Sequence, residues 1–188
     1  MTGVRGQLVE VSGVSRANFG GYTPSEQVEI TREQNVTPYS AGDVVVGIGS
    51  GVARTFQLVK PNNNNGYIVG GKLTSSDVGL SGLWRIHIMN QIPDTFLDNA
   101  ALNITNAEMQ NNYIGNFYLT VETIGGTKVG LPTDVDGNTI ELRVPFYTNG
   151  KQGFAIAETV SGCTFANSGS TIQLTLQYET NAPNAPAV

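Results

Sequence analysis

Cysteine and histidine are nearly absent from this 188-residue chain, which contains one of each. A single Cys excludes an internal disulfide and every cysteine-rich zinc site. A single His excludes a multi-histidine metal centre within one chain, and it leaves one candidate for histidine-based catalysis. We therefore expect a protein that works without a metal ion or a cofactor.

Charged side chains are also scarce. Lys, Arg, Asp and Glu make up 13% of the residues, whereas soluble domains usually contain roughly 25%. The 15 acidic residues outnumber the 10 basic ones, which gives a net charge of -5. Because binding to a phosphate backbone requires clustered Lys and Arg side chains, this balance argues against nucleic acid as a partner.

Long apolar runs are missing as well. The segment from Met1 to Glu10 has neither the basic start nor the apolar run of a signal peptide. The apolar stretches are short, such as Val44–Val46, whereas a membrane helix needs about 20 residues. We expect a protein that is made in the cytoplasm and has no membrane partner.

Residues typical of turns and strands are abundant. The chain contains 23 Gly, 18 Asn and 19 Thr. Gly and Asn tolerate the left-handed backbone of turns, and Thr favours strands. Alternation of apolar and polar residues predicts strands around Val28 and Ile30 and at residues 43–48, 52–59, 67–74, 83–90, 113–123, 139–148, 153–159 and 171–179.

Two of these segments alternate clearly enough to assign their faces. In segment 83–90, one face carries Trp84, Ile86 and Ile88, and the other carries Leu83, Arg85, His87 and Met89. In segment 171–179, a single face carries Ile172, Leu174, Leu176 and Tyr178. The apolar faces are predicted to point into the core.

One short helix is predicted after residue 105. Thr105 and Glu108 have the spacing of a capping box, in which the Thr hydroxyl accepts from the third backbone amide and the Glu side chain reaches back. The helix continues to about Asn112, so it has only one or two turns.

The two ends of the chain differ from the middle. Residues 1–25 are interrupted by Gly and Pro, and we predict an extended N-terminal arm in which Leu8, Val9 and Val11 add one short strand. Residues 180–188 repeat Asn-Ala-Pro, which predicts an extended C-terminal tail. Residues 26–179 are predicted to form one domain.

The expected fold class is all-β. Roughly eight to ten short strands with one small helix indicate an antiparallel sandwich or barrel rather than a parallel sheet. Of these architectures we favour an antiparallel, jelly-roll-like β-sandwich. The length is sufficient for a sizeable core without disulfides.

The residues best suited to nucleophilic chemistry have simple structural interpretations. His87 lies in the middle of a predicted strand beside Arg85, and nothing nearby resembles Gly-x-Ser-x-Gly. A partly exposed strand histidine is therefore the interpretation that we favour. Cys163, within segment 161–165, is typical of a small buried apolar residue. We predict no catalytic residues and no enzymatic activity.

Acidic residues in loops leave two further options open. Asp94 with Asp98, or Asp134 with Asp136, could act as a carboxylate pair for glycoside hydrolysis. Two acids in one loop are nevertheless common without such a role.

The segment from Asp134 to Asn138 faintly resembles a calcium-binding loop. Its Gly falls at the fourth position rather than the sixth, and Pro145 occupies the twelfth position, where an acidic ligand is needed. We favour a hairpin turn here, and a bound cation remains the alternative.

Glycine-rich and aromatic segments do not define a site either. The run from Gly47 to Gly51 lacks the Lys and the following helix of a phosphate-binding loop, so it is predicted to be a turn. Aromatic residues in the predicted strands are expected to pack in the core or at an interface, with a carbohydrate-binding surface as the alternative. These residues are Tyr67, Trp84, Tyr113, Tyr118 and Tyr147.

Several short motifs occur in a familiar order. Segment 30–45 contains Thr-Arg followed by Thr-x-Tyr-x-Ala-Gly-Asp-Val, and segment 65–73 contains Gly-Tyr-Ile, small residues and Leu. An alternating strand follows at 83–89, then Pro and Asp-Asn-Ala-Ala within 93–101, then Ala-Glu at 107–108 and Tyr-Ile-Gly at 113–115. In this order, over about residues 28–120, the chain resembles small virion-associated proteins of tailed bacteriophages.

This resemblance implies a structural protein of the phage head, of the capsid decoration (cement) or head accessory type. The implied partner is the major capsid protein, the implied location is the virion, and no catalytic residue is carried over. A homotrimer would match the three-fold positions of a shell. The alternatives are a receptor- or glycan-binding module of a phage head or tail fibre, and a tail or head–neck completion protein.

Overall fold

The computed structural model describes residues 8–11, 14–17, 25–32, 35–46, 54–56, 65–91, 96–147 and 153–180. They form an all-β, antiparallel structure with one short helix, α1 (Asn106–Asn111). A two-stranded sheet contains β1 (Leu8–Val11) and β2 (Val14–Ala17), and a ten-stranded sheet contains all the other strands. These are β3 (Ser25–Thr31), β4 (Asp43–Val45), β5 (Arg54–Phe56), β6 (Asn65–Ser75), β7 (Leu83–Met89), β8 (Tyr113–Ile124), β9 (Thr127–Thr133), β10 (Val144–Tyr147), β11 (Gly153–Thr159) and β12 (Thr171–Thr180).

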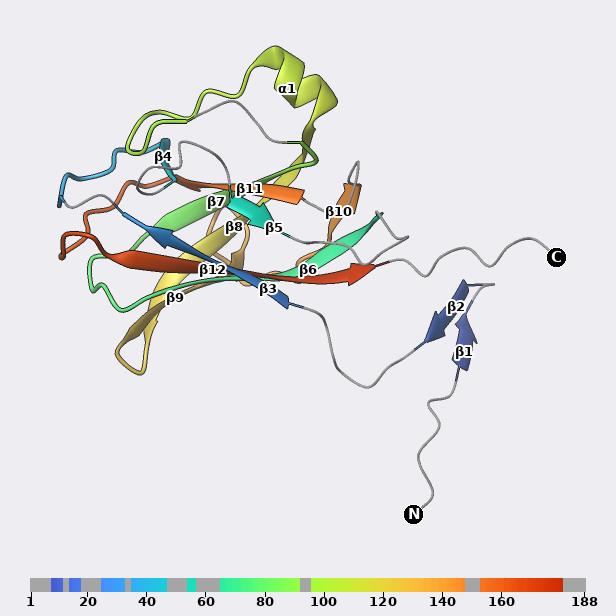
Figure 1. Ribbon diagram of the computed structural model, residues 1–188. Coiled ribbons are helices and arrows are strands. Elements are labelled where there is room, and N and C mark those ends of the chain that lie inside the picture. The colour runs from blue at the N-terminus through green and yellow to red at the C-terminus, as the bar shows by residue number, and fades with distance from the viewer. Residues whose placement is uncertain are drawn as a thin grey trace.

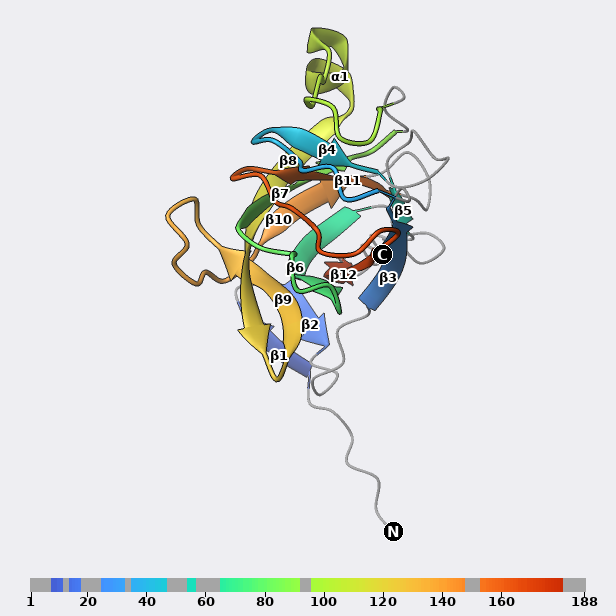
Figure 2. The ribbon, with the colours of Figure 1, turned by 90° about the vertical axis from the view of Figure 1, so that its left-hand side faces the viewer.

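The large sheet curls until it is nearly a closed barrel (Figure 1, Figure 2). Its strand order is β3-β12-β6-β9-β8-β7-β11-β4, with β10 paired to β6 and β5 paired to β11. Strand β3 at one end of this order lies close to β5 at the other end. The prediction of an antiparallel all-β fold is therefore confirmed.

The first two strands pair only with each other. Leu8 lies opposite Ala17 and Val11 opposite Val14, and neither strand joins the large sheet. The sequence predicts only one short strand in this part of the chain, and the structure adds β2 as its partner. The hairpin is therefore a separate element that precedes β3.

The inner face of the curled sheet holds the main core. The four apolar residues of β12 are all buried, and they pack with Trp84, Ile86 and Ile88 of β7. Both face assignments made from alternation are confirmed, because each set of residues lies on the same inner face. The four core residues of β12 are Ile172, Leu174, Leu176 and Tyr178.

Strands β7 and β11 are covered on their outer face as well. Met89 of β7 and Phe154 and Ile156 of β11 form a second apolar cluster there, with Phe96. The segment that leads into α1 lies over this face (Figure 1), and its residues Leu102 and Ile104 pack against the cluster. All seven residues of β11 are consequently buried.

Helix α1 begins at the predicted capping box. The Thr105 hydroxyl accepts from the Glu108 backbone amide at 3.2 Å, and the Glu108 carboxylate accepts from the Thr105 backbone amide at 2.9 Å. The helix ends after Asn111, so the prediction of one or two turns is confirmed. Within the described residues, no helix has the length and apolar character needed to cross a membrane.

Two strand predictions need correction. Strand β9 is not predicted, because Gly130 and Pro132 interrupt its alternation. Proline is tolerated there because β6 pairs with β9 only as far as Gly130, which leaves Pro132 with β8 as its one neighbouring strand.

The predicted strand at 139–148 is too long. Only Val144–Tyr147 forms a strand, β10, and it pairs with the start of β6. One edge of β6 is shared between β10 at Asn65–Ile68 and β9 at Leu73–Ser75. Before β10, Thr139 forms only an isolated bridge with Thr133 at the end of β9.

The capping box provides a direct test of the α1 assignment. Replacing Thr105 with Ala removes the hydroxyl that accepts from Glu108, and we expect the free energy of unfolding to fall by about 1 kcal/mol. The Thr105→Ser variant keeps the hydroxyl and serves as the matched control. Urea denaturation measures both, and equal stability of Thr105→Ala and the unmodified chain would contradict the assignment.

Candidate functional site

The single histidine lies on the outer face of β7 within a chain of hydrogen bonds. His87 Nε2 is 2.7 Å from the Glu158 carboxylate on β11, and His87 Nδ1 is 3.1 Å from the Tyr113 hydroxyl on β8. The Asn116 amide donates to the same hydroxyl at 2.7 Å. Because that hydroxyl accepts from Asn116, its own proton can go to Nδ1, and Nε2 then donates to Glu158.

Arg85 extends this cluster across the sheet. It lies opposite Glu158 in the register of β7 with β11, and opposite Tyr118 in the register of β7 with β8. Its guanidinium is 3.2 Å from the Glu158 carboxylate, and its Nε donates to the Tyr118 hydroxyl at 3.1 Å. The guanidinium also lies 5.1 Å from the centre of the Tyr118 ring. The polar groups thus join three neighbouring strands.

Burial makes this pairing energetically important. His87 is 4% exposed and Glu158 is 7% exposed, and a buried charge without a partner destabilises a fold by several kcal/mol (about 3–5). Burial raises the pKa of the Glu158 carboxyl. The hydrogen bonds and charges of His87 and Arg85 lower this pKa by a larger amount, so it lies below its usual range. Burial raises the pKa of the Tyr113 hydroxyl.

Both nitrogens of His87 have partners, Tyr113 on β8 and Glu158 on β11. The cluster therefore connects β11, β7 and β8. The prediction that His87 is partly exposed is wrong, because the segment around α1 covers the outer face of β7.

A cavity of about 320 Å³ opens beside the cluster. It has a polar wall on the sheet and an apolar wall on the segment that contains α1. The polar wall consists of Arg85, His87, Tyr113 and Asn116, and the apolar wall consists of Leu102, Ile104 and Met109.

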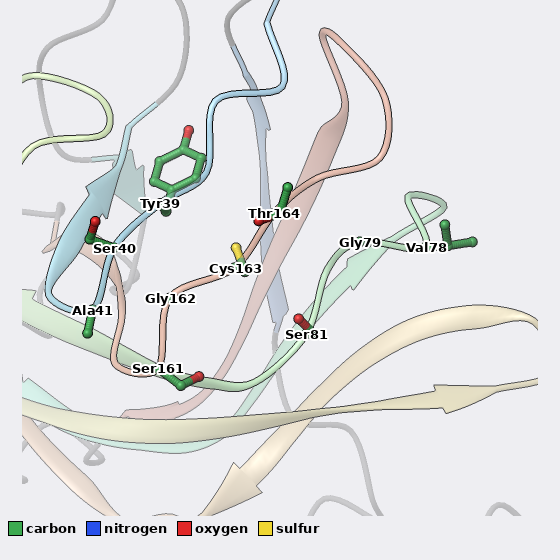
Figure 3. A pocket seen from close by; sticks show the side chains of 10 residues that line it. All are labelled: Tyr39, Ser40, Ala41, Val78, Gly79, Ser81, Ser161, Gly162, Cys163 and Thr164. Atoms are coloured by element: carbon green, nitrogen blue, oxygen red, sulfur yellow. The ribbon is translucent and has the colours of Figure 1, made fainter.

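A larger cavity of about 600 Å³ is lined by segments 39–41, 78–81 and 161–164 (Figure 3). The first and third segments are joined by two backbone hydrogen bonds between Tyr39 and Cys163, of 2.8 and 3.1 Å. Burial raises the pKa of the Tyr39 hydroxyl, and it raises the pKa of the Cys163 thiol to about 12. Both groups therefore remain protonated near neutral pH. The other polar side chains of the lining are the hydroxyls of Ser40, Ser81, Ser161 and Thr164.

A buried arginine stabilises the chain next to this cavity. Arg32 is 1% exposed, and its guanidinium lies 4.7 Å from the Tyr39 ring centre and 4.1 Å from the Phe165 ring centre. Its Nε donates to the Tyr39 hydroxyl at 2.9 Å, which in turn donates to the Asp98 carboxylate at 2.7 Å. The other oxygen of Asp98 accepts from the Val46 backbone amide at 3.0 Å. One relay thus connects the end of β3, the end of β4 and the loop before α1.

The Asp77 carboxylate stabilises the loop before β12 through hydrogen bonds. It accepts from the backbone amides of Gly79, Ala166 and Asn167 at 2.7–2.8 Å, and from the Ser170 hydroxyl. Burial raises the pKa of this carboxyl, but the hydrogen bonds lower it by more, to about 2. A single side chain therefore holds the loop before β12 against the turn before β7.

The Asp134–Asn138 segment is a turn, as predicted. One oxygen of Asp134 accepts from the backbone amides of Asp136 and Asn138 at 2.9 and 2.8 Å, and the other accepts from the Asn138 side chain at 2.9 Å. These bonds, led by those of Asn138, lower the pKa of the Asp134 carboxyl. Among the described residues, no three His, Cys, Asp or Glu side chains form a group that could hold a metal ion.

The remaining predicted positions have structural roles or lie outside the described residues. Asp98 is a hydrogen-bond acceptor in the relay, while Asp94 and segment 47–51 are outside the described ranges. Trp84 is fully buried in the core, as predicted. Tyr67 lies beneath the guanidinium of Arg143, at 4.3 Å, and Tyr147 is 51% exposed.

Sequence reasoning misses the three buried charged residues on which these arrangements depend, Arg32, Asp77 and Glu158. Glu158 has a weak local signal, because it is the one charged residue in the run 153–159. Its main partner, His87, is 71 residues away, so the pairing follows only from the strand register.

The Asp77 carboxylate yields a prediction about stability and pH. We expect Asp77→Asn to lower the free energy of unfolding by about 1–3 kcal/mol, because it removes an acceptor from buried donors. The folded-state pKa of about 2 lies below the ordinary value of 3.8. The carboxylate's contribution is therefore present above pH 4 (roughly) and lost as the pH falls toward 2.

Urea denaturation between pH 2 and pH 7 checks this prediction. The stability difference between the unmodified chain and Asp77→Asn should shrink at the acidic end. The exposed Asp136→Asn change is the matched control and should have little effect. A difference that is constant with pH would contradict the role assigned to Asp77.

The thiol of Cys163 provides a second prediction. A pKa of about 12 leaves roughly one molecule in ten thousand as thiolate at pH 8, and the side chain is buried. We expect almost no reaction of the folded chain with a thiol reagent, and full reaction after unfolding in guanidinium. Rapid labelling of the folded chain would contradict this account.

The chain matches no protein-family model and no curated protein. The resemblance described above is therefore carried by the order of its motifs alone. What the chain does has to be argued from those motifs and from the geometry of the described residues.

Proposed function

We propose that this chain is a non-enzymatic structural protein of a tailed-phage virion, which binds the assembled capsid surface and bridges neighbouring capsomers. Its partner is the major capsid protein, its location is the phage head, and it is made in the host cytoplasm. It binds neither nucleic acid nor membranes. The ordered motifs between about residues 28 and 120 support this proposal through their resemblance to virion-associated proteins.

The observation that carries the proposal is the separation of the β1–β2 hairpin from the large sheet. An isolated two-stranded hairpin is at best marginally stable in water. Its edges can gain stability by adding to the edge of a strand in another protein. An arm that becomes ordered only on a neighbouring subunit stabilises the assembled state selectively.

The use of buried charges in the domain also supports a structural role. Glu158 and Asp77 accept hydrogen bonds from residues that are distant in sequence, and Arg32 lies against the ring of Phe165. These contacts give the β-domain a fixed shape, from which the β1–β2 hairpin can extend to a neighbouring subunit. Rigidity of this kind suits a protein that must hold neighbouring capsomers at a fixed distance.

The finer architecture and the oligomeric state belong to the same proposal. Core side chains of β6 and β12 pack against those of β7 and β11, which supports two facing layers, as in a jelly-roll-like β-sandwich. A homotrimer fits the three-fold positions of a shell. Native mass spectrometry that finds only the monomer would contradict a preformed trimer.

The alternative function, a receptor- or glycan-binding module, calls for exposed aromatic side chains grouped on loops. Tyr147 is the one aromatic residue among the described residues with more than half of its surface exposed, and it lies in a strand. The large cavity has Tyr39 as its one aromatic residue, and this side chain is buried. The geometry therefore favours the capsid proposal.

The capsid proposal is tested with phage particles that lack this protein. We expect the full chain to bind such particles and to raise the temperature at which they release DNA. Deletion of residues 1–17 removes β1 and β2 but leaves β3 complete, and it should weaken binding by at least about tenfold.

Thermal unfolding of the free chain is the control for this deletion. The melting transition should be unchanged, because the hairpin belongs to a separate sheet. Equal binding by the shortened chain would remove the role of the arm. Failure of the full chain to bind, with unchanged release of DNA, would overturn the proposal.

A further inference from the structure

The outer face of β10 and β6 carries two tyrosines and a proline. Pro145 lies directly opposite Tyr67 in the register of β10 with β6, and Tyr147 follows on the same face two residues later. Pro145 is exposed, Tyr147 is 51% exposed and Tyr67 is half-buried. Phe146, between the two β10 residues, points to the opposite face and is buried in the core. The side chains of Tyr67, Pro145 and Tyr147 therefore form one surface, the tyrosine–proline patch.

Arg143 adds hydrogen-bond donors to this patch. Its side chain is exposed, and its guanidinium lies 4.3 Å from the centre of the Tyr67 ring. A guanidinium has five N–H donors, and within the described part of the chain none of those of Arg143 has an acceptor. Glu179, which is exposed, lies opposite Tyr67 in the register of β12 with β6. The patch thus has one charge of each sign beside it, which favours an occupant without a large net charge.

A proline-rich segment has the chemistry to cover such a patch. In the polyproline II conformation the backbone makes no internal hydrogen bonds, so its carbonyl groups can accept from donors on another surface. Aromatic-lined surfaces recognise such segments, and the fixed φ of proline lowers the entropy lost on binding. The patch provides both the aromatic rings and the donors.

The chain itself has a segment of this kind next to the patch. Residues 181–188 read Asn-Ala-Pro-Asn-Ala-Pro-Ala-Val and contain no charged side chain. They follow Thr180, which lies opposite Gly66, the neighbour of Tyr67 (Figure 1). Strand β10 is two strand spacings from β12, or about 10 Å, whereas eight residues in the polyproline II conformation span about 25 Å. The segment is therefore long enough to cross β6 and reach β10.

We infer that residues 181–188 dock on the tyrosine–proline patch of their own chain. The rings of Pro183 and Pro186 pack against the patch, and backbone carbonyls of the segment accept from Arg143. Because the segment is attached beside the patch, its effective concentration there is in the millimolar range, so a contact that is weak between separate molecules is still populated. The inference does not rest on the capsid proposal.

Amide NMR spectra of the ¹⁵N-labelled full chain test this inference. The Pro183→Ala/Pro186→Ala variant removes both proline rings, and we expect it to shift the amide signals within residues 143–147. The Asn181→Ala/Asn184→Ala variant is the matched control, because it makes two alanine substitutions at the same spacing and keeps both prolines. It should leave the signals of residues 143–147 in place. Thermal unfolding verifies that both variants are folded.

A peptide with the sequence of residues 181–188 tests the patch directly. Added to the full-length Pro183→Ala/Pro186→Ala variant, it should shift the same signals back with a Kd of about 1 mM or tighter. It should bind the unmodified chain more weakly, because the chain's own segment competes. A further Tyr147→Ala change should weaken peptide binding at least about tenfold, whereas Tyr147→Phe keeps the ring and should have little effect.

Four results would overturn the inference. The first is identical signals of residues 143–147 in the proline variant and the unmodified chain. The second is the absence of peptide binding to the proline variant at concentrations up to about 10 mM. The third is equal peptide binding to the unmodified chain and the proline variant, which would show that the chain's own segment does not occupy the patch. The fourth is unchanged peptide binding after Tyr147→Ala, which would place the peptide elsewhere.

Discussion

The carboxylate of Glu158 is the group on which the outer face of the sheet depends. Strands β7 and β11 are covered on both faces, by the main core and by the apolar cluster under the α1 segment. Polar side chains on their outer face are therefore removed from water and must find partners within the protein. Glu158 accepts from His87 and Arg85, and these two residues in turn contact the tyrosines of β8.

Buried charged groups also find partners within the protein at the loops that surround the larger cavity. Arg32 is held between two aromatic rings and is linked to Asp98 through the Tyr39 hydroxyl. Asp77 accepts from three backbone amides. A chain with few charged residues thus places several of them in the interior, where each one connects distant segments. The domain gains a fixed shape, while the β1–β2 hairpin forms no pairing with it.

Local patterns explain which features could be predicted from the sequence. The alternation in β12 and β7 and the spacing of Thr105 and Glu108 involve residues that are close in the chain, so their structure follows from neighbours. Strand β9 is not predicted because Gly130 and Pro132 are unusual within strands. They fit here because β6 ends its pairing with β9 at Gly130.

The candidate site depends on contacts between distant residues. His87 is predicted in a strand, but its burial depends on residues 96–113, and its partner Glu158 comes from another strand. The residues next to His87 in the sequence indicate neither its cover by residues 96–113 nor its contact with Glu158. The prediction that Cys163 is buried is confirmed, because a free cysteine usually packs as a small buried apolar residue in any fold.

The central claim is that a rigid β-domain with a separate arm serves as a structural part of a phage head. A cryo-electron microscopy reconstruction of the virion that contains this chain tests it most directly. The account predicts density for the curled sheet on the outer capsid surface, with residues 8–17 in contact with a neighbouring subunit. Density for the domain at the tip of a fibre, or inside the particle, would contradict the claim.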